Sequence, residues 1–239
     1  MSIKAALRRP RTWLLAVPIV VFLVAVVAPY VYIHFIKADP EPPLVLSDVT
    51  TTAPADGGTA TTRVAGAIDG TWVVNPDSVA GYRVDEVLFG QDTEATGRTS
   101  EIEGELQIAG LTIDSASFTV DMSTIQSDEA RRDNQFRNRI MDTSTFPTAT
   151  FELTEPIALD ALPGDGEPVT ASATGELTLR GVTNSVTFDL NAQRNGAVIE
   201  LNGTIAIEFA DYEIPDASGG PATVVDHGSI EFLLVLSPA

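Results

Sequence analysis

The sequence predicts an all-β domain of antiparallel strands that follows one apolar N-terminal segment. Three observations lead to this prediction. Apolar and polar residues alternate with a period of two over most of the chain from Thr71 onward, short turn sequences separate the alternating runs, and only one stretch, near residue 130, breaks the pattern. Such alternation indicates strands with one dry and one wet face, which mainly join as antiparallel neighbours.

The alternating runs define about eight strands. Turn signals such as "IAGL", "LRGVTN" and "QRNGA" separate several of them at hairpin lengths. About eight such strands can close into a barrel or stack as a sandwich, and periodicity alone does not choose between these architectures. The runs span residues 82–88, 101–108, 116–122, 149–153, 169–180, 185–193, 199–209 and 229–236.

The N-terminal segment predicts a membrane anchor. Residues 12–36 form a run of 25 residues without a formal charge. As a helix this run would extend roughly 37 Å, against a hydrocarbon core of about 30 Å. The alternative is a cleaved signal peptide, but the apolar core of such peptides is usually about 7–15 residues long. We expect a retained transmembrane helix.

The flanking charges predict how this helix is oriented. Residues 1–11 carry Lys4, Arg8, Arg9 and Arg11 and no acidic residue. By the positive-inside rule this basic segment stays in the cytoplasm. The C-terminal domain is then extracytoplasmic, on a single-pass protein of the cell membrane.

Residues 37–69 separate the apolar segment from the strands. They are rich in Thr, Pro, Ala, Asp and Gly and offer few apolar side chains to bury. Such a composition favours a disordered linker. The expected organisation is therefore a cytoplasmic segment 1–11, a helix 12–36, a linker 37–69 and a β domain 70–239.

The charge balance excludes one class of partner. Residues 38–239 contain nine basic and thirty-three acidic residues, so their formal charge is 9 − 33 = −24. A surface this acidic repels phosphate polymers, so nucleic-acid binding is not expected. The chain has no cysteine, which removes disulfides, thiolate nucleophiles and zinc–sulfur sites. Its oligomeric state is left open.

Residues 128–141 predict one short α-helix within this β domain. The stretch has no glycine, proline or β-branched run, and Ser127 or Asp128 can cap its start. Phe136 and Ile140 share one face, which we expect to pack on the strand 229–237 or beside it.

Four of the nine arginines after residue 37 lie in or beside this helix. They suit a solvated face balanced by acids, a structural clasp between helix and barrel, or a rim for an anionic head group. The sequence alone leaves these readings open. The four are Arg131, Arg132, Arg137 and Arg139.

Candidates for catalysis, metals and cofactors are few. His227 is the only histidine after residue 37, and it has a neighbouring carboxylate but no second imidazole or thiol. A metal centre needs about three protein ligands, so we expect His227 to be a turn or strand-start residue. No nucleophile elbow, zinc-protease motif or phosphate loop is present. We expect no enzyme activity, no cofactor and no metal.

Two motifs in register resemble the YceI-like polyisoprenoid-binding proteins. The first is an Arg-Asp pair on a short helix followed by a Pro before a Thr/Phe strand, and the second is a Gly-x-Leu-Thr-x-x-Gly-Val-Thr hairpin. The resemblance covers about residues 70–237. The first motif lies at Arg132-Asp133, Phe146-Pro147 and Thr150-Phe151, and the second at Gly175, Leu177, Thr178, Gly181, Val182 and Thr183.

The resemblance implies an extended lipocalin-like antiparallel barrel whose interior holds a long apolar ligand, a polyisoprenoid or another lipid chain. A polar rim would comprise Arg131, Arg132, Asp133 and Arg137. The chain departs from the family pattern at Gln135, Phe136, Glu86 and the stretch Phe209 to Ile214. The lining would comprise Tyr82, Val84, Phe118, Val120, Phe151, Leu153, Leu177, Leu179, Phe188, Leu190, Ile205, Ile207, Ile230 and Phe232.

Periodicity alone is equally compatible with a packed core, because small barrels can be solid or can enclose one ligand. The family resemblance favours the barrel that encloses a ligand. Together with the N-terminal apolar run, it makes a membrane-tethered lipid-binding protein the leading hypothesis. The alternative is a non-catalytic envelope or interaction module with a solid barrel, and an enzyme acting on envelope lipids comes third.

Overall fold

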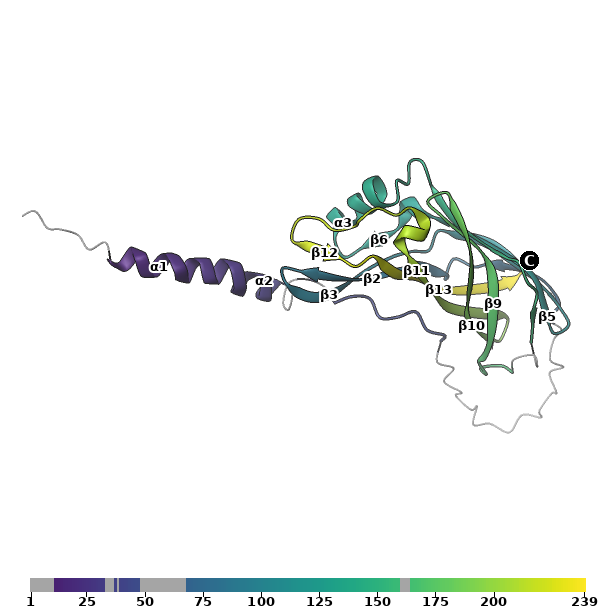
Figure 1. The fold of residues 1–239 in the computed structure, drawn as a ribbon. Coiled ribbons are helices and arrows are strands. Elements are labelled where there is room, and N and C mark those ends of the chain that lie inside the picture. The colour runs from purple at the N-terminus through teal and green to yellow at the C-terminus, as the bar shows by residue number, and fades with distance from the viewer. Residues whose placement is uncertain (1–10, 33–36, 38, 48–67, 160–163) are drawn as a thin grey trace, which may run out of the picture. The chain divides into compact units, whose positions relative to one another are not determined.

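The computed structural model describes residues 11–32, 37, 39–47, 68–159 and 164–239 (Figure 1). The chain forms two compact units, residues 1–39 and residues 40–239, which are treated separately below.

The first unit is helical from Arg11 to Val31. A π-helical turn, η1 (Leu23–Val27), separates α1 (Arg11–Phe22) from α2 (Ala28–Val31). The wider turn comes just before Pro29, whose nitrogen carries no hydrogen to continue the α-helical bonding pattern. Large apolar side chains from Val17 to Val31 are exposed on this unit. None of the described helices combines the length and the apolar character needed to cross a bilayer, and residues 33–36 of the predicted span lie outside the described part.

The second unit is a closed antiparallel barrel. Eight strands form its ring in the order β1, β4, β5, β7, β9, β10, β11 and β13, and β13 pairs back onto β1. The prediction of an all-β protein of about eight antiparallel strands is confirmed, and the strands close into a barrel instead of a sandwich. One strand of the ring differs from the prediction, because residues 70–74 complete the ring and the predicted strand at 82–88 lies outside it. These strands are β1 (Gly70–Val74), β4 (Ile102–Ala109), β5 (Thr112–Asp121), β7 (Thr148–Leu153), β9 (Val169–Leu179), β10 (Val182–Asn195), β11 (Val198–Glu208) and β13 (His227–Pro238).

The last strand closes the ring because it has two partners on one edge. Residues 236–238 of β13 pair with β1, whereas residues 229–233 pair with β2 (Val79–Leu88). Beyond β2 the sheet continues through β3 (Gln91–Thr99) to β6 (Gln126–Ser127). The short strands β12 (Ala222–Val224) and β8 (Ile157–Ala158) pair with β2 and β5. Single 3₁₀ turns occupy η3 (Met122–Thr124) and η5 (Phe209–Tyr212).

Strand β3 was not among the predicted strands, and its composition explains why. The positions of β3 opposite Tyr82 and Val84 are Gly97 and Ala95, so the strand presents almost no apolar bulk to the interior. A Cβ atom at residue 97 would lie 2.5 Å from the ring of Tyr82, so glycine leaves room for that ring. Packing against β2 therefore requires small residues on the inner face of β3. Because these residues produce no alternation of apolar and polar side chains, the strand is not detected from the sequence pattern.

The predicted hairpin turns occur where expected. Leu179 pairs with Val182, which leaves Arg180 and Gly181 as a two-residue loop with φ of 50° and 78°. Positive φ at both central residues is the geometry of a type I′ turn, which matches the twist of the strands it joins. The "IAGL" and "QRNGA" sequences likewise turn β4 into β5 and β10 into β11.

The predicted helix at 128–141 is present in two short pieces, α3 (Ala130–Gln135) and the π-helical η4 (Phe136–Ile140). Its N-cap is Glu129 rather than Ser127 or Asp128, and the Glu129 carboxylate accepts a hydrogen bond from the backbone of Arg131. Phe136 is buried and stacks on Tyr82 of β2, with ring centroids 5.2 Å apart. Because β2 neighbours β13, the helix packs beside the predicted strand.

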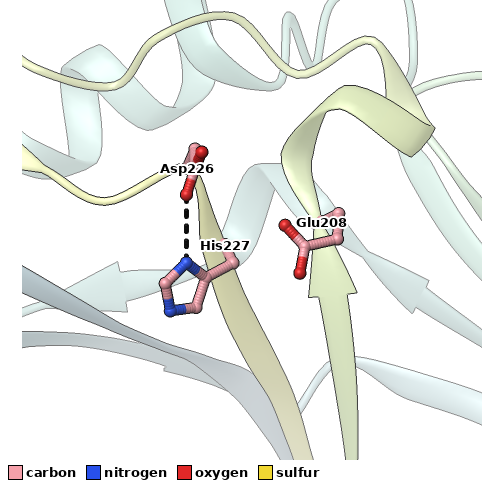
Figure 2. Close-up of side chains that lie close together, drawn as sticks. All are labelled: Glu208, Asp226 and His227. Carbon is pink, nitrogen blue, oxygen red and sulfur yellow. Dashed lines mark hydrogen bonds and ion pairs between the residues drawn. The ribbon is translucent and has the colours of Figure 1, made fainter.

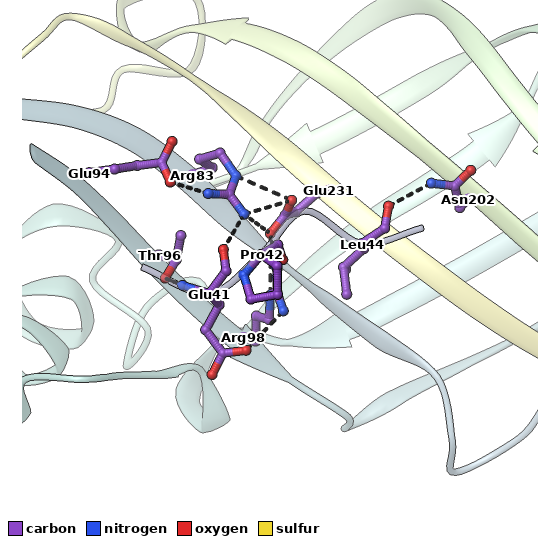
Figure 3. A network of polar contacts seen from close by, with 9 residues as sticks. All are labelled: Glu41, Pro42, Leu44, Arg83, Glu94, Thr96, Arg98, Asn202 and Glu231. Atoms are coloured by element: carbon purple, nitrogen blue, oxygen red, sulfur yellow. Dashed lines mark hydrogen bonds and ion pairs between the residues drawn. The ribbon is translucent and has the colours of Figure 1, made fainter. Parts of the chain in front are cut away.

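Part of the predicted linker belongs to the barrel unit. Residues 41–47, which we call the strap, form an extended segment that is hydrogen-bonded to side chains on the outside of the barrel (Figure 3). This differs from the expected disorder, because polar barrel side chains bind the strap backbone itself. Ile68 is also buried and accepts a hydrogen bond from the Trp72 indole. Residues 48–67 lie outside the described residues.

Candidate functional site

The barrel interior contains a cavity of about 100 Å³. Its described lining includes no charged side chain and one hydroxyl residue, Thr150. An apolar cavity of this kind stays dry and favours hydrocarbon over any group that needs hydrogen bonds. The lining comprises Ala80, Ile102, Leu106, Ile113, Ala116, Phe118, Val120, Ala149, Thr150, Phe151, Leu153, Ile157, Ala173, Leu177, Leu179, Phe188, Leu190, Leu201, Ile205, Ile230, Phe232 and Leu234.

Most of the predicted lining residues surround this cavity. Eleven of the fourteen do so, and whether they bind a ligand stays a prediction. These are Phe118, Val120, Phe151, Leu153, Leu177, Leu179, Phe188, Leu190, Ile205, Ile230 and Phe232.

Three predicted lining residues lie elsewhere. The ring of Tyr82 is stacked on Phe136, so it fills the space between β2 and the helix instead of facing the cavity. Val84 lies on the same strand, close to where a Cβ atom at Gly228 would stand. Ile207 packs at the edge of the core, near the end of β11. The alternation correctly placed these residues on the inner face, but it carries no information on how far along the barrel the cavity extends.

The sequence reasoning missed several lining positions. Ile102, Leu106, Ala173 and Leu201 were in phase with the inner face and could have been included. The small residues Ala80, Ala116 and Ala149 had no such signal, because alanine also occurs on exposed faces. It is these small side chains that leave space between the larger ones.

Aromatic rings occupy much of the interior. The ring of Phe188 meets those of Phe151 and Phe232 edge to face, at centroid distances of 5.5 and 5.8 Å. Such edge-to-face pairs are favourable beyond the apolar area they bury. The interior therefore combines a packed aromatic cluster with a remaining cavity. It is neither fully packed nor open enough to enclose a long ligand.

Glycines in the barrel wall provide room for three of the rings. A Cβ atom at Gly104 would lie 2.6 Å from Phe118, one at Gly175 would lie 2.4 Å from Phe151, and one at Gly203 would lie 2.7 Å from Phe232. Each phenylalanine thus lies over a glycine on a neighbouring strand. The rings rest against the wall, and this keeps part of the interior free.

The clustered arginines contact the protein itself. Arg132 forms ion pairs with Asp128 and with Glu86 of β2, the latter at 3.1 Å. Burial alone would lower the pKa of Arg132, but the charges of Glu86 and Asp128 outweigh it and raise that pKa above its usual value. Burial also raises the pKa of the neighbouring Tyr82 well above its ordinary range. Arg132 therefore joins the helix to the barrel as a permanent cation.

Asp133 and Arg137 of the predicted rim, and Arg139 beside it, also contact the protein itself. Asp133 accepts hydrogen bonds from the backbone nitrogen and the hydroxyl of Ser127, at 2.8 and 2.6 Å. Arg137 donates to the Ile125 carbonyl at 3.5 Å, and Arg139 donates to three carbonyls of residues 216–218. Arg131 is exposed. None of these side chains lines the cavity, so their placement supports the structural clasp over a head-group site.

One cluster of possible metal ligands lies on the barrel surface (Figure 2). Within the described part of the chain, Glu208, Asp226 and His227 bring ligand atoms within 4.8 Å of one another. All three residues are exposed, and exposed acidic groups of this kind are common without a bound ion. The Nδ1 atom of His227 lies 3.1 Å from the Asp226 carboxylate, and this hydrogen bond raises the pKa of His227. The Asp226–His227 contact is therefore an exposed hydrogen bond that becomes an ion pair when the imidazole is protonated.

We predict that Arg132→Met destabilises the protein by about 3 kcal/mol, because it removes the ion pair that Arg132 forms with the buried carboxylate of Glu86, whose side chain is 5% exposed. The double variant Arg132→Met/Glu86→Leu recovers most of this loss, since it removes the buried charge as well. Urea denaturation measures both. The exposed neighbour is the matched control, and Arg131→Met should change stability by less than about 0.5 kcal/mol. Equal losses for the two single variants would contradict the clasp.

We predict that the His227 imidazole titrates above its ordinary pKa of about 6.5, because the Asp226 carboxylate accepts a hydrogen bond from the protonated ring. The raised pKa means that the protonated ring stabilises the fold below the unfolded-state pKa. This stabilisation disappears as the pH rises through the folded-state pKa. NMR titration of the imidazole hydrogens measures it, with His227→Gln assigning the signal, and Asp226→Asn should bring the pKa back down. An unchanged pKa in Asp226→Asn would contradict the pair.

Comparison with known proteins agrees with this fold. The barrel is similar to the structure of a polyisoprenoid-binding domain from Saccharophagus degradans implicated in plant cell wall breakdown, with a TM-score of 0.57 and 19% identity over 71% of this chain and 98% of that one. It is also similar to BcnA from Burkholderia cenocepacia, with a TM-score of 0.54 and 21% identity over 68% of this chain and 98% of that one. At these identities the likeness shows the fold alone. No curated protein matches the chain.

The family assignment rests on the sequence itself. A family model described as the YceI-like domain matches residues 72–236, which is more than half of the chain and includes all or part of every strand of the barrel ring. Both recognised motifs, the helix with its Arg-Asp pair and the Gly-x-Leu-Thr hairpin, fall within this range. The chain therefore belongs to the YceI-like family.

Proposed function

We propose that the barrel binds the hydrocarbon chain of a lipid, such as a polyisoprenoid, in its interior. The observation that carries this proposal is the cavity inside a closed barrel, whose described lining has no charge and one hydroxyl residue. A relative with the same fold is described as a polyisoprenoid-binding domain. Burying a chain here would contribute about 0.8 kcal/mol per enclosed methylene.

The size of the cavity sets a condition on this binding. At about 100 Å³ it is smaller than the roughly 150 Å³ cavity that takes up benzene in another protein, so it encloses only a short part of a lipid chain. A longer chain enters if the rings of Phe151, Phe188 and Phe232 turn aside.

The lining also favours binding over turnover. Among the described residues, it contains no acid, base or metal ligand that could act on a bound molecule. The aromatic packing supports a second candidate, a non-catalytic interaction module with a barrel that takes up no ligand. The two candidates differ in one measurable property, the stabilisation of the protein by added lipid.

We further propose that the N-terminal segment holds the barrel at a membrane, on the extracytoplasmic side. The support is the charge-free run 12–36 behind a basic segment, together with the exposed apolar side chains of α1, η1 and α2.

We predict that filling the cavity abolishes lipid uptake. Ala173 is 1% exposed and lines the cavity, so Ala173→Leu inserts three carbons into it, at a cost of about 1–3 kcal/mol in stability. Full-length protein with a hundredfold excess of a polyprenol over its dissociation constant should gain about 2.7 kcal/mol in the wild type. It should gain much less in the variant. The melting temperature measures both.

The matched control for this experiment is Ala158→Leu, because Ala158 is exposed on β8 and does not line the cavity. It should bind lipid as the wild type does. If no lipid raises the melting temperature of the wild type, lipid binding is refuted and the interaction module remains.

We predict the membrane topology from the same proposal. The chain has no cysteine, so single cysteines report their location without background. In intact cells that make the full-length chain, a maleimide that does not cross membranes should label Ser115→Cys on the exposed face of β5. It should label Ser2→Cys only after lysis. The reverse pattern would refute the proposed orientation, and labelling of both in intact cells would refute a retained span.

A further inference from the structure

The strap contacts the barrel mainly through its backbone. Leu44 and Leu46 are half-buried, whereas Val45 between them is 67% exposed, as expected for an extended chain with one side against a surface. The strap contains two prolines at 42 and 43, which favour extended backbone and remove two hydrogen-bond donors. Six of its polar backbone atoms, in Glu41, Pro42, Leu44 and Ser47, form hydrogen bonds with barrel side chains that lie on several strands.

Two arginines and a threonine bind the start of the strap (Figure 3). Arg83 donates to the carbonyl of Glu41 at 2.7 Å, and Arg98 donates to the carbonyl of Pro42. The Glu41 backbone nitrogen donates to the Thr96 hydroxyl at 3.3 Å. The Glu41 carboxylate also pairs with Arg98 at 2.9 Å, but its side chain is 65% exposed, so this ion pair adds little.

Two amides and a carboxylate bind the rest of the strap. Asn202 of β11 donates to the Leu44 carbonyl at 2.7 Å. Gln193 of β10 donates to the Ser47 carbonyl at 3.1 Å. The Ser47 backbone nitrogen donates to the Glu200 carboxylate at 2.9 Å. Along the strap, the barrel thus supplies four donors to backbone carbonyls and two acceptors to backbone nitrogens.

The barrel face beneath the strap is an ordered polar surface. The residues involved point outward from β3, β2, β11 and β10, opposite to the residues that line the cavity. Arg83 and Arg98 both pair with Glu231 of β13, which is 3% exposed, and Arg83 also pairs with Glu94. Arg83 and Arg98, two of the nine arginines after residue 37, are therefore held in position by glutamates of the barrel, independently of their contacts with the strap. A side chain held this way loses little entropy when it binds.

We propose that this outer face is a binding site for an extended peptide backbone and that residues 41–47 occupy it as a ligand in cis. The site recognises mainly main-chain groups, as in other modes that bind extended peptides. Because the strap is part of the same chain, its effective concentration is about millimolar, so weak contacts suffice to keep it bound. A peptide of the same kind, supplied separately, binds once the strap is absent.

The first test measures whether the strap is bound in the full-length protein. Val45 points away from the barrel, so a nitroxide on Val45→Cys reports strap motion in this cysteine-free chain. The label should be immobilised when Val45→Cys is the only change in the chain. The triple change Thr96→Val/Gln193→Ala/Asn202→Ala removes three hydrogen bonds, each worth about fivefold in the ratio of bound to released strap. The combined decrease should be about a hundredfold, seen as a mobile EPR line shape.

The control removes hydrogen bonds of the same types from the barrel surface elsewhere. Asn184 donates to the Asp211 carbonyl, and Thr174 and Thr178 bond to threonines on β10. The change Asn184→Ala/Thr174→Val/Thr178→Val should leave the label immobilised, and circular dichroism verifies that both variants are folded. A label that is as mobile in the wild type as in the first triple variant would overturn the proposal.

The second test supplies the ligand separately. In the full-length chain, residues 41–47 are replaced by glycine and serine, and a fluorescent peptide of residues 39–47 is added. Saturable binding by fluorescence anisotropy is expected, with Asn202→Ala weakening it about fivefold. N-methylation of the Ser47 nitrogen removes the donor to Glu200 and should weaken binding at least about tenfold. Glu41→Gln in the peptide should weaken it less than about threefold, because that carboxylate is largely exposed.

Each outcome of this titration decides the proposal. An absence of saturable binding up to about millimolar peptide, the effective concentration of the strap in cis, would overturn it. Binding that depends on Glu41 but not on Asn202 or the Ser47 nitrogen would also overturn it, because recognition would then be by charge and not by the backbone.

Discussion

The structure depends on closure of one antiparallel ring in a register that keeps every second residue inside. The ring closes because β13 pairs with β11 along one edge and with both β1 and β2 along the other. Side chains in a strand alternate strictly, so a shift of one residue in any pairing would exchange the inner and outer faces. The apolar cavity and the polar outer face are thus consequences of the same hydrogen-bonding pattern.

The inner face holds a balance between packing and free space. Phe151, Phe188 and Phe232 pack edge to face across the interior, and glycines and alanines on the wall compensate for their volume. A barrel with larger residues at those small positions would be solid, and one without the rings would be wide enough to fill with water or ligand. The same aromatic cluster contributes to the stability of the empty barrel and occupies the place that a longer ligand needs.

The contacts of the arginines show how this acidic protein uses its few cations. Arg132 and Arg139 attach the short helix to β2 and to the loop at 216–218, Arg180 donates to the Glu213 carbonyl, and Arg83 and Arg98 join β2, β3 and β13 to the strap. Each of these arginines contacts backbone carbonyls or carboxylates of the protein itself. These arginines therefore hold peripheral segments onto the barrel, and no arginine of the described residues lines the cavity.

The sequence by itself determined the secondary structure of most of the barrel, its inward and outward faces and its family. These properties follow from local alternation, from turn residues such as Arg180-Gly181 and from two short motifs, all of which can be read without knowing which strands are neighbours. Strand β3 was missed because Gly97 and Ala95, which lie opposite larger side chains of β2, are too small to give an apolar pattern. The extent of the cavity, the partners of Arg132 and the binding of residues 41–47 to the barrel were decided by tertiary structure. They depend on distances between residues far apart in sequence, such as Leu44 and Asn202, and a local pattern carries no such information.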